Sequence, residues 1–353
     1  MMKTSSKIIM IGIFFALLLF VGCQRQAETF SVFEEEKLDE AKNYEEPIII
    51  ILTHSEMENS LTHEIALKLK EVLERESENK FVVDVYPNNT FGSLTDNVEY
   101  FSKGAVEMRL GSGPSKIISI VKWLPSVIEI NTYELNEALK PGHKLRNLVD
   151  EECSNYNAKI IGSTPLIYRM MTSNKKINSI EDFSKINIRV INDGIYKNYW
   201  EALGSQTSTF NIEQVYTALQ QNIVDAQENT IPSIVSNKLY EQQKYLTITK
   251  HMLANDMLYV NQDFYNSLSP EKQELIEKAA KTAVDYGTSK TINYLIDGNK
   301  KLEAEGIEVV ALPEEEKKKM NEIVKPIVID YLKKTYGNEL FEKILLTVNN
   351  KQY

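Results

Sequence analysis

The stretch that decides the fold starts as Pro47-Ile48-Ile49-Ile50-Ile51-Leu52 and reaches Phe81-Val82-Val83-Asp84-Val85-Tyr86. Its first run is continuously apolar, as is typical of a buried parallel strand, and its last run also predicts a strand. Between them, residues 61–73 place apolar side chains mostly at helical spacing. Another strand is predicted over 106–110, after a loop and a helix. Strands that alternate with helices in this way predict βαβ units with right-handed crossovers.

The same alternation resumes after residue 158, with strands predicted near 159–162, 168–173, 186–190 and 223–227 and helices over 194–203 and 212–220. We therefore expect two α/β lobes. A long helical tract follows over 269–305, where Ser269-Pro270-Glu271 supplies a cap, a proline at the first position and an acidic first turn. At 1.5 Å per residue, about 36 residues reach about 54 Å, so we expect this helix to run across both lobes.

Length and composition narrow the class of protein. The 353 residues match about two domains, and contents of 42% hydrophobic and 25% charged residues are ordinary for a globular protein. The net charge of −10 argues against a nucleic-acid partner, because that affinity rests mostly on cations facing phosphates. With 2 cysteines, at most one disulfide is possible, which excludes a disulfide framework and a cysteine-rich zinc module.

The N-terminus has the layout of a secretory signal, in which Lys3 and Lys7 precede an apolar run over 8–21 and then Gly22-Cys23. A transmembrane anchor is the alternative, but about 14 residues span only about 21 Å, short of the hydrocarbon core of about 30 Å. The end of the run resembles a bacterial lipobox, in which the cysteine receives lipid after cleavage. We therefore expect a signal peptide over 1–22, lipidation of Cys23 and anchoring on the outer face of a membrane.

Residues 23–46 are expected to form a flexible tether, because they carry Glu34-Glu35-Glu36 and almost no apolar periodicity. Lipidation of Cys23 leaves Cys153 without a disulfide partner. Cys153 ends a helix-like stretch over 145–153, and we expect a half-buried free thiol there rather than a catalytic one. The charged run over 314–319 is expected to be a solvated helix face.

Motifs of well-known enzyme classes are missing. The sequence contains no Gly-x-Ser-x-Gly elbow, no Walker loop and no Gly-x-Gly-x-x-Gly fingerprint. The four histidines are scattered, and His63-Glu64 lacks the second histidine that a zinc-protease helix needs four residues later. We therefore expect no metal and no cofactor, while an enzyme is left unsupported rather than excluded.

Arg169 and Arg189 lie inside or at the end of predicted strands, where a charge without a partner is costly. One interpretation is that a planar guanidinium grips a carboxylate bidentately at the carboxyl end of a strand, where open α/β sheets bind ligands. The other interpretation is an internal salt bridge with one of the many acidic residues. Spacing alone leaves both interpretations open.

Several ordered motifs are more specific. They include Ile186-Asn187-Ile188-Arg189-Val190, Glu213-Gln214-Val215-Tyr216-Thr217-Ala218-Leu219-Gln220, Ile223-Val224-Asp225-Ala226-Gln227-Glu228-Asn229 and Leu268-Ser269-Pro270-Glu271-Lys272-Gln273. Over nearly all of residues 47–345, the chain resembles the DctP-like solute-binding proteins of tripartite ATP-independent periplasmic (TRAP) transporters. This resemblance implies an α/β, two-lobed clamp like other periplasmic binding proteins, with a long inter-lobe helix. It implies lobe I over 47–166 plus 255–294 and lobe II over 167–254 plus 295–353.

The resemblance also implies the residues of the site. Arg189 matches the arginine that forms the main salt bridge to the ligand carboxylate, Arg169 matches a second arginine that helps to hold the acid, and Asn229 matches an asparagine that contacts it. Phe210 matches an aromatic position that packs on the ligand, with a core phenylalanine as the alternative. The remaining candidates lie in strand ends or loops where family members vary the pocket, or in the hinge: His54, Ser93, Glu107 and Glu228.

The function implied by the resemblance is that of an extracytoplasmic binding protein. Such a protein captures an organic acid, a monocarboxylate or a dicarboxylate, in the cleft between its lobes and delivers it to the membrane subunits of a TRAP permease. No catalytic step is involved. Two alternatives stay open: a sensor lipoprotein that presents a small acid to a receptor, and an enzyme that turns its ligand over.

Overall fold

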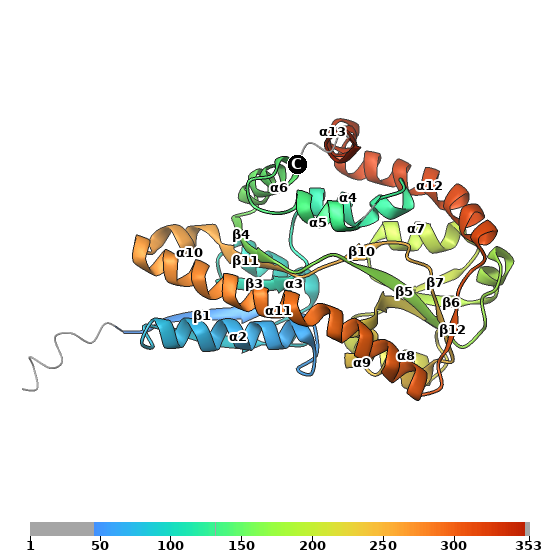
Figure 1. Cartoon of the computed structure of the whole chain (residues 1–353), viewed down its shortest axis with the longest axis horizontal. Helices are drawn as coiled ribbons and strands as arrows, with labels where there is room; N and C mark the ends of the chain where they lie inside the picture. Colours follow the sequence, from blue (N-terminus) through green and yellow to red (C-terminus); the bar gives the residue numbers. More distant parts are fainter. Residues whose placement is uncertain (1–45, 131, 350–353) are drawn as a thin grey trace, which may run out of the picture. The chain divides into compact units, whose positions relative to one another are not determined.

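The computed structural model describes residues 46–130 and 132–349 (Figure 1). The predicted signal peptide, Cys23 and the predicted tether up to residue 45 lie outside the described residues. The described chain has the expected α/β class, with two sheets and many helices. Within it, no helix combines the length and the apolar character needed to cross a membrane.

The first sheet has the strand order β2-β1-β3-β11-β4. Its strands are β1 (Ile48–Thr53), β2 (Phe81–Tyr86), β3 (Met108–Gly111), β4 (Ala158–Ser163) and β11 (Met257–Asn261). β1 and β3 are parallel, as the βαβ pattern predicts, and α2 (Leu61–Glu76) connects β1 to β2. β11 departs from that pattern, because it comes from far along the chain and lies antiparallel between β3 and β4.

The second sheet has the order β12-β9-β5-β8-β6-β7, with β10 paired to β5. Its strands are β5 (Ile167–Ser173), β6 (Asn187–Val190), β7 (Gln206–Thr209), β8 (Ala226–Thr230), β9 (Tyr245–Thr247), β10 (Leu253–Ala254) and β12 (Glu308–Val310). β6 is parallel to β7 and β8, with α7 (Gly194–Ala202) and α8 (Ile212–Gln220) as the connecting helices. β5 runs antiparallel to β8 and β9, so this sheet is also mixed.

Two short segments carry the chain from one sheet to the other. Residues 164–166 join β4 to β5, and residues 255–256 join β10 to β11. The segments are tied together, because the Thr164 amide donates to the Asp256 carbonyl at 2.8 Å and the Asp256 amide donates to Thr164 Oγ1 at 2.9 Å. These crossing segments therefore hold the carboxyl end of β4 and the start of β11 in one place.

The long helix α11 (Pro270–Ala304) provides a third connection. The Ser269 side chain accepts a hydrogen bond from the Lys272 amide and caps its start, as predicted. Two glycines allow close packing: a Cβ on Gly287 would lie 2.4 Å from Ile65 Cδ1 on α2. A Cβ on Gly298 would lie 2.6 Å from Ile231 Cγ2 on α9 (Ile231–Ser236). The helix thus packs on elements beside both sheets (Figure 1), which confirms the predicted inter-lobe helix.

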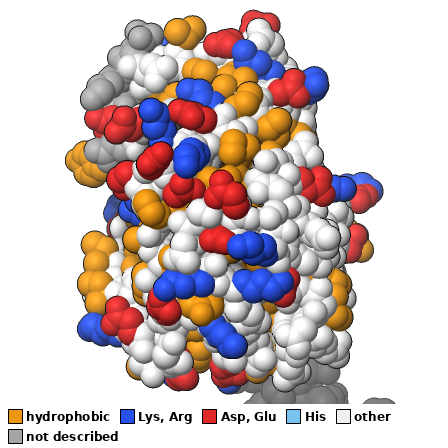
Figure 2. Space-filling view, turned by 90° about the vertical axis from the view of Figure 1, so that its right-hand side faces the viewer, with side chains coloured by type: hydrophobic (Ala, Val, Ile, Leu, Met, Phe, Trp, Pro, Cys, Tyr) orange, Lys and Arg blue, Asp and Glu red, His pale blue; other side chains and the backbone are white. Residues whose placement is uncertain are grey.

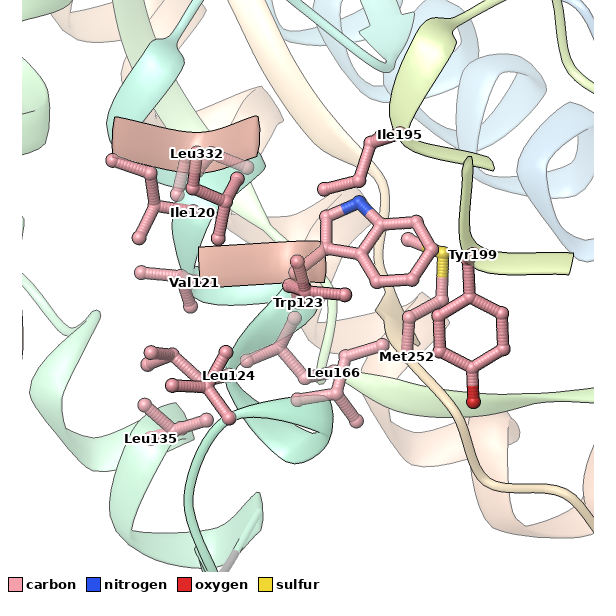
Figure 3. Close-up of a cluster of buried hydrophobic side chains, with 14 of the residues drawn as sticks. Ile120, Val121, Trp123, Leu124, Leu135, Leu166, Ile195, Tyr199, Met252 and Leu332 are labelled. Atoms are coloured by element: carbon pink, nitrogen blue, oxygen red, sulfur yellow. The ribbon is translucent and has the colours of Figure 1, made fainter. Parts of the chain in front are cut away.

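A large apolar cluster lies beside α4 (Lys116–Trp123), α7 and α12 (Glu314–Tyr336). Figure 3 shows Trp123 of α4 surrounded by Leu166, Ile195, Tyr199 and Met252. The cluster extends into α5 (Thr132–Ala138), α6 (Lys144–Ser154) and α13 (Asn338–Asn349), and it includes Cys153. The thiol of Cys153 is fully buried rather than half-buried, and burial raises its pKa to about 12, so it is unreactive at neutral pH.

The surface carries charges of both signs. Figure 2 shows acidic and basic side chains interspersed on one face of the molecule. The run over 314–319 begins α12, where Lys317 pairs with Glu314 at 2.6 Å and Lys319 with Glu316 at 2.8 Å, so it is the predicted solvated helix face. Exposed pairs of this kind contribute little to stability.

Candidate functional site

A cavity of about 150 Å³ lies where the two sheets meet at the crossing segments. Its wall includes residues from the loop after β1, from α4, from both crossing segments and from β5 and β8. The polar and charged residues that line it include Glu56, Lys122, Arg169, Tyr196, Asn229 and Asp256. A dry cavity of this volume holds a molecule about the size of benzene, so the cavity suits a small ligand.

Arg169 enters the cavity from β5 and is only 7% exposed. Its Nε donates to Glu228 Oε2 at 2.5 Å, and its Nη2 donates to Glu228 Oε1 at 2.9 Å. Glu228 lies on the neighbouring antiparallel strand β8, in a diagonal position, which brings the two side chains together. The internal salt bridge considered from the sequence is therefore present. Arg169 Nη1 makes no hydrogen bond with the described residues and remains available to a ligand.

Glu228 is fully buried and is held in its charged form. Burial alone would raise its pKa, but the charge of Arg169 and hydrogen bonds from His251 and Arg169 outweigh burial and lower the pKa to about 2. His251 Nε2 lies 3.1 Å from Glu228 Oε2, and the imidazole is enclosed by Trp123, Tyr199 and Trp200. Burial lowers the pKa of His251, so its imidazole is neutral at pH 7.

Arg189 lies at the carboxyl end of β6 and is 3% exposed. Its Nε and Nη2 both donate to the Phe210 carbonyl, at 2.9 Å and 2.5 Å. In the described part of the chain, no carboxylate lies within 4.0 Å of its guanidinium. Burial lowers its pKa to about 10, although the charge of Glu228 acts in the opposite direction. Arg169 thus has a carboxylate in contact, Glu228, whereas Arg189 feels Glu228 and Glu213 only at longer range.

The surroundings of the two arginines differ. Arg169 lines the cavity and lies 6.0 Å from the centre of the Tyr196 ring, within reach of a cation–π contact. Arg189 does not line the cavity, whereas Ile191, two residues further on, does.

Asn229 lines the cavity from β8: its Oδ1 accepts from the Thr230 amide, and its Nδ2 makes no hydrogen bond with the described residues.

The other candidates from the sequence lie outside the cavity wall. His54 is buried, with its Nε2 3.0 Å from His63 Nδ1, and burial lowers its pKa to about 3. Ser93 caps α3 (Leu94–Ser102) in a capping box with Asp96. The remaining two have structural contacts: the Glu107 carboxylate accepts from the Ile51 amide at 2.8 Å, and Phe210 packs beside a buried apolar cluster while its carbonyl holds Arg189.

Three charged residues of the cavity were not predicted: Glu56, Lys122 and Asp256. Glu56 follows the end of β1 by three residues, and the rule that ligands bind beyond the carboxyl ends of strands could have identified it. Lys122 lies in an apolar helix, and Asp256 lies between two strands that the sequence did not predict, so neither had a local signal. Within residues 46–130 and 132–349, no group of three or more metal-ligating side chains could hold a metal ion.

The fold is that of known binding proteins. The family model of the bacterial extracellular solute-binding proteins, family 7 (DctP), matches residues 52–335. The chain is 27% identical to the sialic acid-binding periplasmic protein SiaP of Vibrio cholerae over 238 residues, 65% of this chain and 72% of that protein. It is 26% identical to the C4-dicarboxylate-binding periplasmic protein DctP of Rhodobacter capsulatus over 252 residues, 68% of this chain and 73% of that protein.

A crystal structure of a TRAP periplasmic solute-binding protein from Desulfovibrio salexigens with bound orotic acid superposes with a TM-score of 0.77. The two sequences are 20% identical, and the match covers 86% of this chain and 99% of the other. Two mixed sheets joined by crossing segments around a polar cavity are the architecture of the two-lobed binding-protein fold. The chain belongs to the bacterial extracellular solute-binding protein family 7.

Proposed function

We propose that this protein captures a small organic acid in its cavity and delivers it to the membrane subunits of a TRAP-type transporter. The observation that supports this most directly is the pair of buried guanidinium groups, Arg169 and Arg189: among the described residues, only Arg169 has a carboxylate, Glu228, within 4.0 Å. A buried cation without a counter-ion is costly, and a ligand carboxylate removes that cost. The proposal involves no chemical step on the ligand.

We expect the ligand carboxylate to bind first to the unpaired hydrogen-bond donors of the second sheet. The ligand carboxylate meets Arg169 Nη1 and Asn229 Nδ2, with the positive charge of Arg189 behind them. A charge-assisted contact of this kind contributes roughly 1.5–3 kcal/mol, about one to two decades in affinity, so further contacts have to supply the rest. The hydrogen bond from Ser233 Oγ on α9 to Glu56 Oε2, at 3.1 Å, joins the two sides of the cavity and would favour a closed state around the ligand.

The size of the cavity supports a small acid. Its volume of about 150 Å³ is enough for a molecule near the size of benzene. Orotic acid, bound in the Desulfovibrio salexigens protein, is a single six-membered ring with one carboxylate, somewhat larger than benzene. Sialic acid, named as the ligand of the Vibrio cholerae relative, is a much larger molecule. We therefore place the ligand of this protein among the small carboxylates.

The proposal includes an extracytoplasmic location, with a lipid anchor at Cys23 after removal of residues 1–22. The family description, extracellular solute-binding protein, supports the location. We also propose the lobes as 47–166 plus 255–294 and 167–254 plus 295–353. The crossing segments at 164–166 and 255–256 support the first boundaries of this division.

A thermal-shift screen of the purified protein against small carboxylates, sugar acids and amino acids tests the proposal. A ligand that binds only the folded state adds RT ln(1 + [L]/Kd) to the free energy of unfolding, about 2.7 kcal/mol at a hundredfold excess over Kd. For a chain of this length we expect a rise in Tm of about 5 °C. If no carboxylate raises the Tm, or if the acid is recovered chemically changed, the proposal is wrong.

The affinity for a carboxylate is expected to fall as the pH rises through about 8. Burial lowers the pKa of Lys122, which lines the cavity with no carboxylate of the described residues within 4.0 Å, to about 8. Lys122 is therefore charged below this pH and neutral above it. Loss of that charge near a bound carboxylate should raise Kd by about tenfold between pH 7 and 9.

Calorimetric titrations at several pH values would measure this loss, with Lys122→Arg as the matched variant. Arginine stays charged over the whole range, so the variant should keep a constant Kd. A wild-type affinity that does not change between pH 7 and 9 would show that Lys122 does not contribute to binding.

A further inference from the structure

The cavity has an acidic side, formed by Glu56 and Asp256. Glu56 lies in the loop after β1, and Asp256 lies in a crossing segment. Thr62 Oγ1 donates to Asp256 Oδ2 at 2.6 Å, while Ser233 donates to Glu56. A hydroxyl group therefore fixes each carboxylate, the Asn237 side chain also hydrogen-bonds to Glu56, and Asp256 Oδ1 makes no hydrogen bond with the described residues.

Neither carboxylate of this acidic side is in contact with a cation of the described residues. In the described part of the chain, no lysine or arginine nitrogen lies within 4.0 Å of Glu56 or Asp256. Burial raises the pKa of both groups, and the charge of Asp256 adds to the shift of Glu56. More distant cations act in the opposite direction: Arg169 on Glu56, and Lys122 and Arg109 on Asp256. Because burial outweighs these distant cations, two carboxylates that line a small cavity with no cation in contact are costly to ionise unless a ligand supplies one.

Buried polar groups without partners line the same cavity. Arg169 is 7% exposed and has its Nη1 unpaired, and Asn229 is 6% exposed with its Nδ2 unpaired. Asn255 is 8% exposed, and its Oδ1 has no partner, while its Nδ2 donates to Ser163 Oγ at 3.0 Å. The cavity thus combines free donors on the second sheet with free acceptors at the crossing segment.

Charges of both signs surround the cavity. Lys122 and Arg169, which is paired with Glu228, line it together with Glu56 and Asp256, and the buried Arg109 and Arg189 lie outside its lining. A dicarboxylate with one carboxylate at Arg169 would bring its second negative charge close to Glu56 and Asp256. Like charges in a desolvated site repel strongly, whereas a ligand with one charge of each sign places a cation beside these carboxylates.

We infer that the ligand is a small zwitterion, with a carboxylate held on the side of Arg169 and a cationic nitrogen, such as an ammonium group, facing Glu56 and Asp256. The inference rests on the proposed capture of a carboxylate. An ammonium group has three donors, and its hydrogen bonds to carboxylates are charge-assisted. A hydroxyl group donates only one hydrogen bond and brings no charge. An amino acid therefore fits the cavity better than the hydroxy acid or the unsubstituted acid of the same size.

The test compares acids that share a carbon skeleton and differ in one group. Propionate, lactate and alanine form one set, butyrate, 4-hydroxybutyrate and 4-aminobutyrate a second, and succinate, malate and aspartate a third. Calorimetric titration of the purified protein should find its tightest ligand among the amino members, with a Kd at least about tenfold below that of the hydroxy analogue. If a hydroxy or unsubstituted acid binds as tightly, the zwitterion is wrong and the proposed capture of a carboxylate stands. If no acid binds, both are wrong.

Two charge-removing variants, Glu56→Gln and Asp256→Asn, identify the group that recognises the nitrogen. Each should raise the Kd of the amino ligand by at least about tenfold and leave the hydroxy analogue unchanged or improved. Glu58→Gln is the matched control, because Glu58 is exposed in the same loop and does not line the cavity. Asp256→Asn removes a charge at a crossing segment, so Glu56→Gln gives the answer if that variant fails to fold. An equal loss for both ligands would overturn the inference.

Discussion

Arg189→Met is expected to weaken ligand binding by roughly one to two decades while the ligand-free protein stays within about 1 kcal/mol of wild-type stability. The first effect follows because the variant removes the uncompensated positive charge near the cavity. The second follows because methionine replaces a desolvated cation that has no acidic partner, which offsets the lost hydrogen bonds to the Phe210 carbonyl. Titration calorimetry measures the first effect, and urea unfolding measures the second.

Arg146→Met is the matched control. Arg146 is also buried, but it lies in α6 outside the cavity, donates to Asp150 Oδ1 at 2.8 Å and donates to the Ile160 carbonyl at 3.0 Å. This variant should lose about 2 kcal/mol of stability and keep the Kd of the wild type. If Arg189→Met instead destabilises the fold and binds normally, Arg189 is a structural residue and the proposed site is wrong.

Much of the fold could be predicted where local patterns agree with the tertiary structure. The apolar run at Ile48 predicts β1, which lies inside the first sheet between β2 and β3. Ser269 and Pro270 predict the start of α11, because a cap and a proline act within one helical turn. The positions of Arg169 on β5 and Arg189 at the end of β6 were also predicted from the sequence, since both lie in apolar strands that are easy to recognise.

Hydrophobic patterns misplaced a strand whose buried side chains are polar. The sequence predicts a strand over 223–227, whereas β8 runs over Ala226–Thr230 and every residue in it is buried. Gln227 is buried because its Nε2 donates to Thr172 Oγ1 at 2.8 Å, and Glu228 because it pairs with Arg169. Hydrophobic periodicity cannot detect a strand whose side chains are buried through partners on another strand.

The remaining unpredicted site residues come together through contacts between segments that are far apart in the sequence. Glu56 and Asp256 come together because β11 inserts between β3 and β4 and carries the crossing segment to the end of the first sheet. No local signal encodes a contact between segments 200 residues apart in the chain. The candidates His54, Ser93 and Glu107 were chosen for their place at strand ends and loops, and place alone does not determine which way a side chain points.

Glu228→Gln is expected to lower the free energy of unfolding by roughly 3–5 kcal/mol at pH 7, because it leaves Arg169 buried without its counter-ion. The pKa of Glu228 falls from its ordinary value of 4.5 to about 2 on folding. Its contribution to stability is therefore complete above about pH 4.5 and is lost as the pH falls toward 2. The urea unfolding curves of variant and wild type should differ most at neutral pH and converge in acid. Glu303→Gln, on the exposed side of α11, should change stability by less than about 0.5 kcal/mol.

The ligand separates a structural Glu228 from one that belongs to the binding site. In Glu228→Gln, neither Arg169 nor Arg189 has a carboxylate of the described residues within 4.0 Å, so a bound carboxylate compensates a larger unbalanced charge than in the wild type. The ligand-induced rise in Tm should therefore be larger in Glu228→Gln than in the wild type, although the ligand-free variant is less stable. Equal rises in Tm would mean that the ion pair supports the fold and does not set the charge that the ligand meets.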